Sequence, residues 1–175
     1  LKVSWKVVPA ATSYQIYRST AKDGDYQNIK TINSVGTSSW TDGSVKTGKT
    51  YYYKIKTVVK TQNGEQTSGF SNVKSAKAVP AKTTLKAKAS DAKNVKLTWS
   101  KVKGASGYAI YRSNSKDGKY SKVKTISKGS TTSYKNGKLK KSTTYYYKIR
   151  AYRKVNGKKV YGSYSSVVSV KTKAK

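Results

Sequence analysis

Two short strings of the sequence combine aromatic rings with cations and are the first candidates for chemistry. The string TYYYKI occurs at residues 50–55 and again at residues 144–149. Tyrosine rings can stack on sugars or bases, and cations can pair with sulfate, phosphate or carboxylate groups. The residues that could build such a face are Tyr17, Tyr52, Lys54, Tyr111, Tyr146, Lys148 and Arg150.

Residues suited to catalysis are scarce. The chain has no histidine, no cysteine and six carboxylates, and its serines and threonines have no partner base. Asp23, Asp42 and Asp117 each precede a glycine, where we expect the side chain to serve a turn. The other carboxylates are scattered, at Asp25, Glu65 and Asp91. They form neither the acid pair of a glycoside hydrolase nor a calcium cluster. The sequence therefore predicts no enzyme activity, no cofactor and no metal site.

The elements that must position the tyrosines belong to one unit that is written twice. Trp5 matches Trp99 at a shift of 94 residues, and Phe70 matches Tyr164 at the same shift. The same shift relates Tyr14, Tyr17, Tyr26, Trp40 and Tyr51 to Tyr108, Tyr111, Tyr120, Tyr134 and Tyr145. Only the Asn-Gly turns, at Asn63 and Asn156, are expected to slip by one residue. A repeat of this length is a whole domain.

Each copy has the pattern of an all-β domain. The strings LKVSW (1–5) and VKLTW (95–99) alternate apolar and polar residues, and turn signals of the Asp-Gly and Asn-Gly type recur between such strings. No segment has a sustained helical period. Short strands at regular spacing, in units of roughly 90–100 residues, predict a β-sandwich.

The strings resemble a known family. VSWKVVPAATSYQIYRS (3–19) and LTWSKVKGASGYAIYRS (97–113) resemble the B and C strands of fibronectin type III domains. VKTGKTYYYKIKT and LKKSTTYYYKIRA resemble that family's E–F corner and F strand. The resemblance covers nearly the whole chain, and implies two immunoglobulin-like β-sandwiches in tandem, at residues 1–79 and 80–175.

The strands look most like copies carried by Gram-positive bacterial proteins that are secreted or attached to the cell wall. This resemblance implies an extracellular location and a spacer or adhesion role beside other domains of the same larger protein. We also expect a monomer.

The two copies are expected to differ at their start. Copy two has a plausible A strand near Thr83–Ser90, with Leu85 fourteen residues before Trp99. Copy one has four residues before Trp5, so we expect its A strand to be missing and its B strand to be a sheet edge. The junction is expected at 79–81, where Pro80 cannot donate to a strand ladder. A linker this short favours a semi-rigid rod.

Strand alternation divides the tyrosines into two groups. Tyr51 and Tyr53 share one face of their strand, and Tyr52 and Lys54 share the other. The family resemblance makes Tyr51 and Tyr145 tyrosine corners, whose hydroxyl groups bond to nearby backbone. The resemblance also makes Val45 and Leu139 the buried residues that accompany the corners.

The outward residues of strands C and F form the candidate face. Because these strands are neighbours in the fold, Tyr17 is expected near Tyr52 and Lys54, and Tyr111 near Tyr146 and Lys148. Two interpretations stay open at this point. Such pairs stabilise exposed sheets by about 0.2–1 kcal/mol each, and they could also bind a glycan or an anionic polymer.

The charge permits the same two interpretations. The chain has 38 Lys+Arg against 6 Asp+Glu, a formal net charge of +32. Two functions fit this excess: it keeps the protein soluble, or it attracts polyanions such as teichoic acid, sulfated glycans or mucin. The lysines are dispersed and no groove-reading helix is predicted, so we expect no specific nucleic-acid partner. No apolar run is long enough for membrane insertion.

Overall fold

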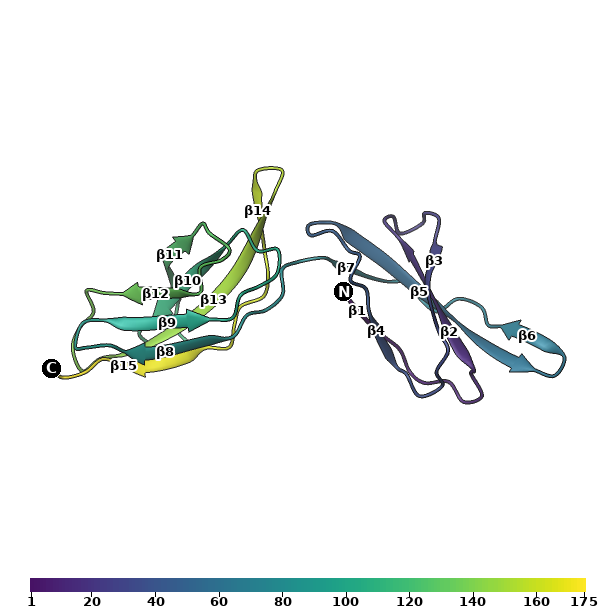
Figure 1. The fold of residues 1–175 in the computed structure, drawn as a ribbon, viewed down its shortest axis with the longest axis horizontal. Coiled ribbons are helices and arrows are strands. Elements are labelled where there is room, and N and C mark those ends of the chain that lie inside the picture. The colour runs from purple at the N-terminus through teal and green to yellow at the C-terminus, as the bar shows by residue number, and fades with distance from the viewer. The chain divides into compact units, whose positions relative to one another are not determined.

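The computed structural model describes residues 1–175 as fifteen strands without a helix (Figure 1). It therefore holds no helix that is long and apolar enough to cross a membrane. The chain divides into two compact units, Leu1–Ala78 and Val79–Lys175. Each unit builds its own core from strands that alternate inward and outward residues.

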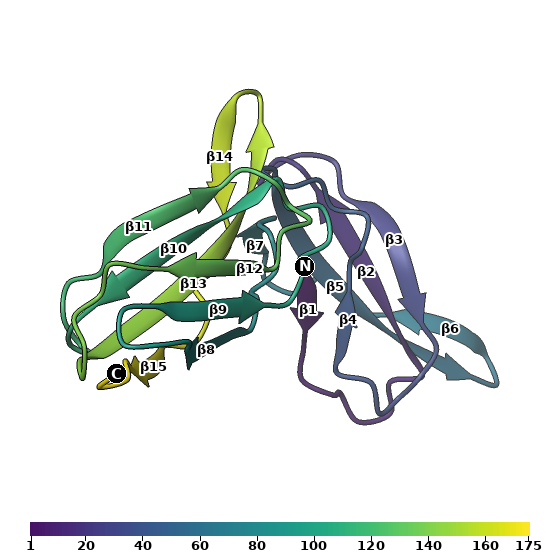
Figure 2. The ribbon, with the colours of Figure 1, turned by 60° about the vertical axis from the view of Figure 1, so that its left-hand side comes forward.

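The second unit is a sandwich of two antiparallel sheets. Its smaller sheet has the order β12–β9–β8, which are Ser133–Asn136, Val95–Trp99 and Leu85–Ala89 (Figure 2). Its larger sheet contains β11 (Ser121–Ile126), β10 (Gly107–Ser113), β13 (Thr144–Val155), β14 (Lys158–Tyr161) and β15 (Val168–Lys171). Strand β13 is the longest of these, and it pairs with β10 on one side and with β14 and β15 on the other.

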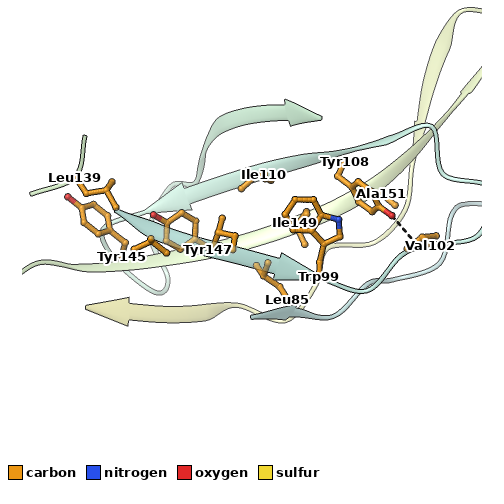
Figure 3. Packing of buried hydrophobic residues seen from close by; sticks show 12 residues of the cluster. Leu85, Trp99, Val102, Tyr108, Ile110, Leu139, Tyr145, Tyr147, Ile149 and Ala151 are labelled. Atoms are coloured by element: carbon orange, nitrogen blue, oxygen red, sulfur yellow. Dashed lines mark hydrogen bonds between the residues drawn. The ribbon is translucent and has the colours of Figure 1, made fainter. Parts of the chain in front are cut away.

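Aromatic and branched residues fill the space between these sheets. Trp99 of β9 packs on Tyr108 of β10, with 5.4 Å between their ring centroids. Leu85, Ile110 and Ile149 close the core around them (Figure 3). The Tyr108 hydroxyl reaches the end of the core and accepts a hydrogen bond from the Val102 N–H at 3.0 Å. Large rings supply the apolar area that the low content of leucine and phenylalanine leaves short.

The first unit repeats this plan with one strand fewer. Its larger sheet contains β3 (Gln27–Ile32), β2 (Ser13–Ser19), β5 (Thr50–Thr61), β6 (Gly64–Thr67) and β7 (Lys74–Lys77). Its smaller sheet has only β1 (Lys2–Ser4) and β4 (Ser39–Thr41). Because no strand corresponds to β8, β1 is a sheet edge, as the sequence predicts.

The open edge of the first unit leaves a cavity of about 670 Å³. Trp5, Tyr14, Tyr53 and Ile55 are among the residues that line it. In the second unit Leu85 of β8 packs in the core beside Trp99. The first unit therefore has a less completely filled core than the second.

Both tyrosine corners are present. The Tyr51 hydroxyl accepts a hydrogen bond from the Lys46 N–H at 2.9 Å, and the Tyr145 hydroxyl accepts one from the Lys140 N–H at 3.0 Å. Leu139 is buried and Val45 packs partly buried against its core. These bonds confirm the roles that the family resemblance implied.

The Asn-Gly pairs slip by one residue between the copies, as noted from the sequence, but the strand pairing does not. Thr61 pairs with Gly64 in the first unit, and Val155 pairs with Lys158 in the second, so the repeat shift of 94 holds through both turns. In the second unit Asn156 and Gly157 are the two turn residues, with φ of 48° and 74°. In the first unit Gly64 instead opens β6, with φ of 113°. The two Asn-Gly pairs therefore occupy different positions in their hairpins, although the strand pairing of the two copies is the same.

The strand order settles the fold class. In the second unit one sheet contains the A, B and E strands, which are β8, β9 and β12. The other sheet places the C strand, β10, beside the F strand, β13, and the G strand, β15, on the far side of β13. The first unit has the same arrangement without its A strand. The protein is all-β, with two immunoglobulin-like sandwiches of the fibronectin type III kind in tandem, as predicted.

Candidate binding face

The candidate face lies on the outer side of the larger sheet in each unit. In the first unit β2 and β5 place Tyr17 directly opposite Lys54. In the second unit β10 and β13 place Tyr111 opposite Lys148. Tyr52 lies two residues before Lys54 on β5, opposite Ser19. Tyr146 lies two residues before Lys148 on β13, opposite Ser113.

This face is partly covered in the structure. All seven candidate side chains are half-buried, and Ala109, which points outward beside Tyr111, is fully buried. The cause in the second unit is the segment 162–165, which returns along β13 before β15 begins. The Gly162 N–H donates to the Ala151 carbonyl at 2.9 Å, and the Ser165 N–H donates to the Ile149 carbonyl at 2.7 Å. This segment holds Tyr164 against the outer side of the sheet.

The second unit arranges rings and cations alternately on this face. The Lys148 ammonium lies 4.1 Å from the centroid of the Tyr120 ring and 4.5 Å from that of Tyr164. The Arg150 guanidinium carbon lies 4.6 Å from the Tyr164 centroid and 4.0 Å from that of Tyr161. We call these five residues the ring–cation stack.

Arg150 is fixed at the centre of this arrangement. Its Nη2 donates to the Tyr111 hydroxyl at 2.8 Å, and its carbon lies 5.3 Å from the Tyr111 centroid. Its Nε is buried without a hydrogen-bond partner. Tyr111 and Tyr164 also meet edge to face, with 5.2 Å between their centroids. The guanidinium is thus enclosed by three rings of its own domain.

The first unit has a shorter version of the same arrangement. The Lys54 ammonium lies 4.1 Å from the Tyr26 centroid and 3.8 Å from that of Phe70, and the Lys56 ammonium lies 4.4 Å from Phe70. Phe70 is held by its neighbour Ser71, which receives the Ile55 N–H on its hydroxyl and donates its own N–H to the Ile55 carbonyl. Phe70 itself remains 45% exposed, so this version is less well covered.

These contacts show how the candidate cations are already used. A cation over an aromatic ring gains about 0.5–1 kcal/mol when exposed and about 2 kcal/mol when desolvated. A ligand anion would have to compete with these rings for Lys54, Lys148 and Arg150. Tyr52 and Tyr146 take part in none of the ring–cation pairs.

Sequence reasoning missed several residues that form the ring–cation contacts of both units. They are Tyr26, Lys56 and Phe70 in the first unit and Tyr120, Tyr161 and Tyr164 in the second. Tyr26 and Tyr120, and Phe70 and Tyr164, are related by the repeat shift of 94. An aromatic residue at the same place in both copies was therefore the available signal.

Asp42 has a larger role than the turn residue that the sequence predicted. Its side chain is 1% exposed, and its Oδ2 accepts from Arg18 Nη1 at 2.7 Å and from the Tyr53 hydroxyl at 2.9 Å. Its Oδ1 accepts from the N–H and the hydroxyl of Ser44. Burial alone would raise the pKa of Asp42, but the hydrogen bonds from Ser44, Arg18 and Tyr53 outweigh it and lower the pKa to about 2. Asp42 is thus a buried, fully paired carboxylate that joins β2 to β5.

Asn136 takes the place of Asp42 in the second unit. Its Oδ1 accepts from Arg112 Nη1 at 3.2 Å and from the Tyr147 hydroxyl at 2.9 Å. Burial raises the pKa of Tyr147 to about 12, so the tyrosine stays a donor at neutral pH. The same bridge is therefore built once with a charged acceptor and once with a neutral one.

Comparison with known proteins returns short or distant likenesses. No family model matches the chain. A stretch of 56 residues, 32% of this chain, is 43% identical to an amylopullulanase of Thermoanaerobacter thermohydrosulfuricus. That stretch amounts to 4% of the amylopullulanase.

Two solved structures are similar in outline. The FN1–FN3 domains of chicken CNTN1 are 18% identical with a TM-score of 0.48, over 98% of this chain and 62% of that one. FN3tt is 21% identical with a TM-score of 0.43, over 55% of this chain and 95% of that one.

Proposed function

We propose that the chain is a non-catalytic tandem of β-sandwiches in a larger extracellular bacterial protein, where it sets the distance between neighbouring domains. The observation that carries this proposal is the length of the junction. Ala78 is buried in the first unit, where its N–H donates to the Lys49 carbonyl at 2.8 Å. Pro80 is buried and lies against Gly162 of the second unit. Only Val79, which is exposed, separates the two.

The match to the amylopullulanase supports the same proposal. The stretch shared with this chain is a small part of that protein, as expected for an accessory domain carried beside other domains. Secretion or cell-wall attachment, and a Gram-positive source, belong to this proposal.

A distance measurement across the junction tests the spacer. Because the chain has no cysteine, nitroxide labels can be placed specifically by Lys30→Cys in the first unit and Lys124→Cys in the second, both at exposed positions. Double electron–electron resonance should give a narrow distance distribution, close in width to a control pair placed entirely within the second unit. Insertion of a flexible Gly-Ser linker after Val79 should broaden the distribution. A wild-type junction as broad as this insertion would refute the spacer.

Attachment to polyanions is the second candidate function, and the balance of ion pairs favours it. The chain has 38 basic side chains but forms two ion pairs, Arg18–Asp42 and Lys60–Glu65. The uncompensated lysines create a long-range field that attracts anionic polymers. Binding to such a polymer should be detectable at low salt and fall steeply as salt is added. No binding at about 20 mM salt, a concentration that leaves the Debye length near 20 Å, would exclude this function.

A further inference from the structure

Three lysines form a continuous row across the smaller sheet of the second unit. Lys88 of β8 lies directly opposite Lys96 of β9, and Lys96 lies opposite Lys135 of β12. All three side chains are exposed. Figure 2 shows the three strands side by side. Adjacent strands are about 4.8 Å apart, so the row is about 10 Å long.

This row is unfavourable for the fold by itself. Like charges directly opposite each other on neighbouring strands are destabilising. Neither ion pair of the chain involves these lysines. Hydrogen bonds from the Lys93 N–H and the Asn94 side chain lower the pKa of Asp91, and the charge of Lys135 lowers it further without an ion pair between the two. None of the three lysines therefore forms an ion pair within the protein.

The row differs from the cations of the candidate face. Lys54, Lys148 and Arg150 lie over rings, whereas no aromatic ring lies under Lys88, Lys96 or Lys135. These three ammonium groups are free to meet an anion from solution. The first unit lacks the row, because its Lys2 lies opposite Thr41 and no third strand is present.

A hollow beside the row adds neutral donors to the positive charges. It has a volume of about 300 Å³ and is lined by Ser90, Lys96, Ser133, Tyr134 and Lys135. Two lysines and three hydroxyl-bearing residues thus line a space of the size at which small-molecule sites begin. Such a set suits a tetrahedral oxyanion, which accepts several hydrogen bonds at once.

We propose that Lys88, Lys96 and Lys135 bind the phosphate or sulfate esters of an anionic polymer, one ester group lying in the hollow between Lys96 and Lys135. This inference rests on the second candidate function, attachment to polyanions, and assigns the binding site to the smaller sheet of the second unit. Neighbouring esters along the polymer would pair with the remaining lysine of the row. The site lies on the opposite sheet from the Tyr/Lys face that the sequence suggested.

Two triple variants of the full chain test the proposal. The first, Lys88→Ser with Lys96→Ser and Lys135→Ser, removes the row. The matched control, Lys122→Ser with Lys124→Ser and Lys128→Ser, removes three exposed charges from β11 and the loop that follows it in the same unit. Calorimetric titration with inorganic polyphosphate and with dextran sulfate, at about 50 mM salt, gives the affinities. We expect the row variant to bind at least ten-fold more weakly than wild type, and the control to lose less than three-fold.

The outcomes separate the site from the function. Equal losses in both variants would show that only the diffuse charge matters and would overturn the site, while leaving polyanion attachment standing. Wild-type protein that binds neither polymer would overturn both. Binding to one polymer alone, lost in the row variant, supports the site and names its ester. Amide shifts at Lys88, Lys96 and Lys135 on titration provide an independent readout, and a melting temperature at or above that of wild type shows that the row variant is folded.

Discussion

Asp42 and Asn136 occupy equivalent positions in the two units, and each accepts a hydrogen bond of 2.9 Å from a core tyrosine. One acceptor is ionised and the other is neutral. The same hydrogen bond therefore has a carboxylate acceptor in the first unit and an amide acceptor in the second, and only the carboxylate can be protonated by acid.

The first prediction concerns this difference. The pKa of Asp42 is lowered from 3.8 to about 2, so its contribution is complete above the unfolded value and is lost as the pH falls toward 2. We expect the free energy of unfolding of the first unit to fall by roughly 2 kcal/mol between pH 5 and pH 2. Amide resonances of each unit, followed in urea at several pH values, measure this change.

Asp42→Asn is the control for that change. It should weaken the first unit at pH 7, because the ion pair to Arg18 is lost, and should flatten its response to acid. An equal response of Asp42→Asn and wild type between pH 5 and pH 2 would mean that another group causes the loss.

The second prediction concerns the tyrosine corners. Tyr145→Phe leaves the Lys140 N–H without its acceptor, and should lower the free energy of unfolding of the second unit by about 1–3 kcal/mol. Tyr146→Phe removes a hydroxyl that has no hydrogen-bond partner in the protein, and should change stability by less than about 0.5 kcal/mol. Urea unfolding of both variants decides this, and similar losses would contradict the assigned corner.

The third prediction concerns the ring–cation stack. Tyr164→Leu keeps an apolar side chain beside Lys148 and Arg150 but removes the ring between them. We expect a loss of about 1–3 kcal/mol for the second unit, since two cation–ring contacts disappear. The loss should persist at 1 M salt, because these contacts are partly buried and are screened little. An unchanged stability would show that the stack contributes nothing to the fold.

The fourth prediction concerns the order of unfolding. The first unit lacks the strand that places Leu85 in the core of the second, and its open edge leaves a cavity of about 670 Å³. We expect the first unit to unfold at lower urea and lower temperature than the second. Its two indoles, Trp5 and Trp40, should then change emission before Trp99, which a Trp99→Phe variant distinguishes. Simultaneous unfolding would mean that the cavity carries no penalty.

Side-chain alternation predicted the fold from the sequence. The inward residues that alternation assigned to β2, β5, β10 and β13 are buried tyrosines and isoleucines, such as Tyr14, Tyr51 and Ile110. The missing A strand followed from the four residues before Trp5, and the corners followed from the family resemblance. These features are local, so a short string contains the information that determines them.

The covering of the candidate face was not predictable in the same way. The segment 162–165 has no strand pattern, and its place on β13 depends on bonds from Gly162 and Ser165 to residues more than ten positions earlier. The role of Asp42 was hidden for a similar reason, since an Asp-Gly pair is a turn signal whatever lies across the sheet. The lysine row depends on the register of three strands, and charge composition says nothing about register.

The exposed run from Lys60 to Lys77 has a consequence for how long the two units survive among proteases. Trypsin-like enzymes cut after basic residues, and with 38 of them the chain offers many potential sites. Some of them lie in strands that are paired on both sides. Residues 60 to 77, in contrast, form an unbroken exposed stretch, in which β6 and β7 each have one neighbour. Cleavage should therefore begin at Lys60, Lys74 or Lys77, and the digested protein should persist as its intact C-terminal half.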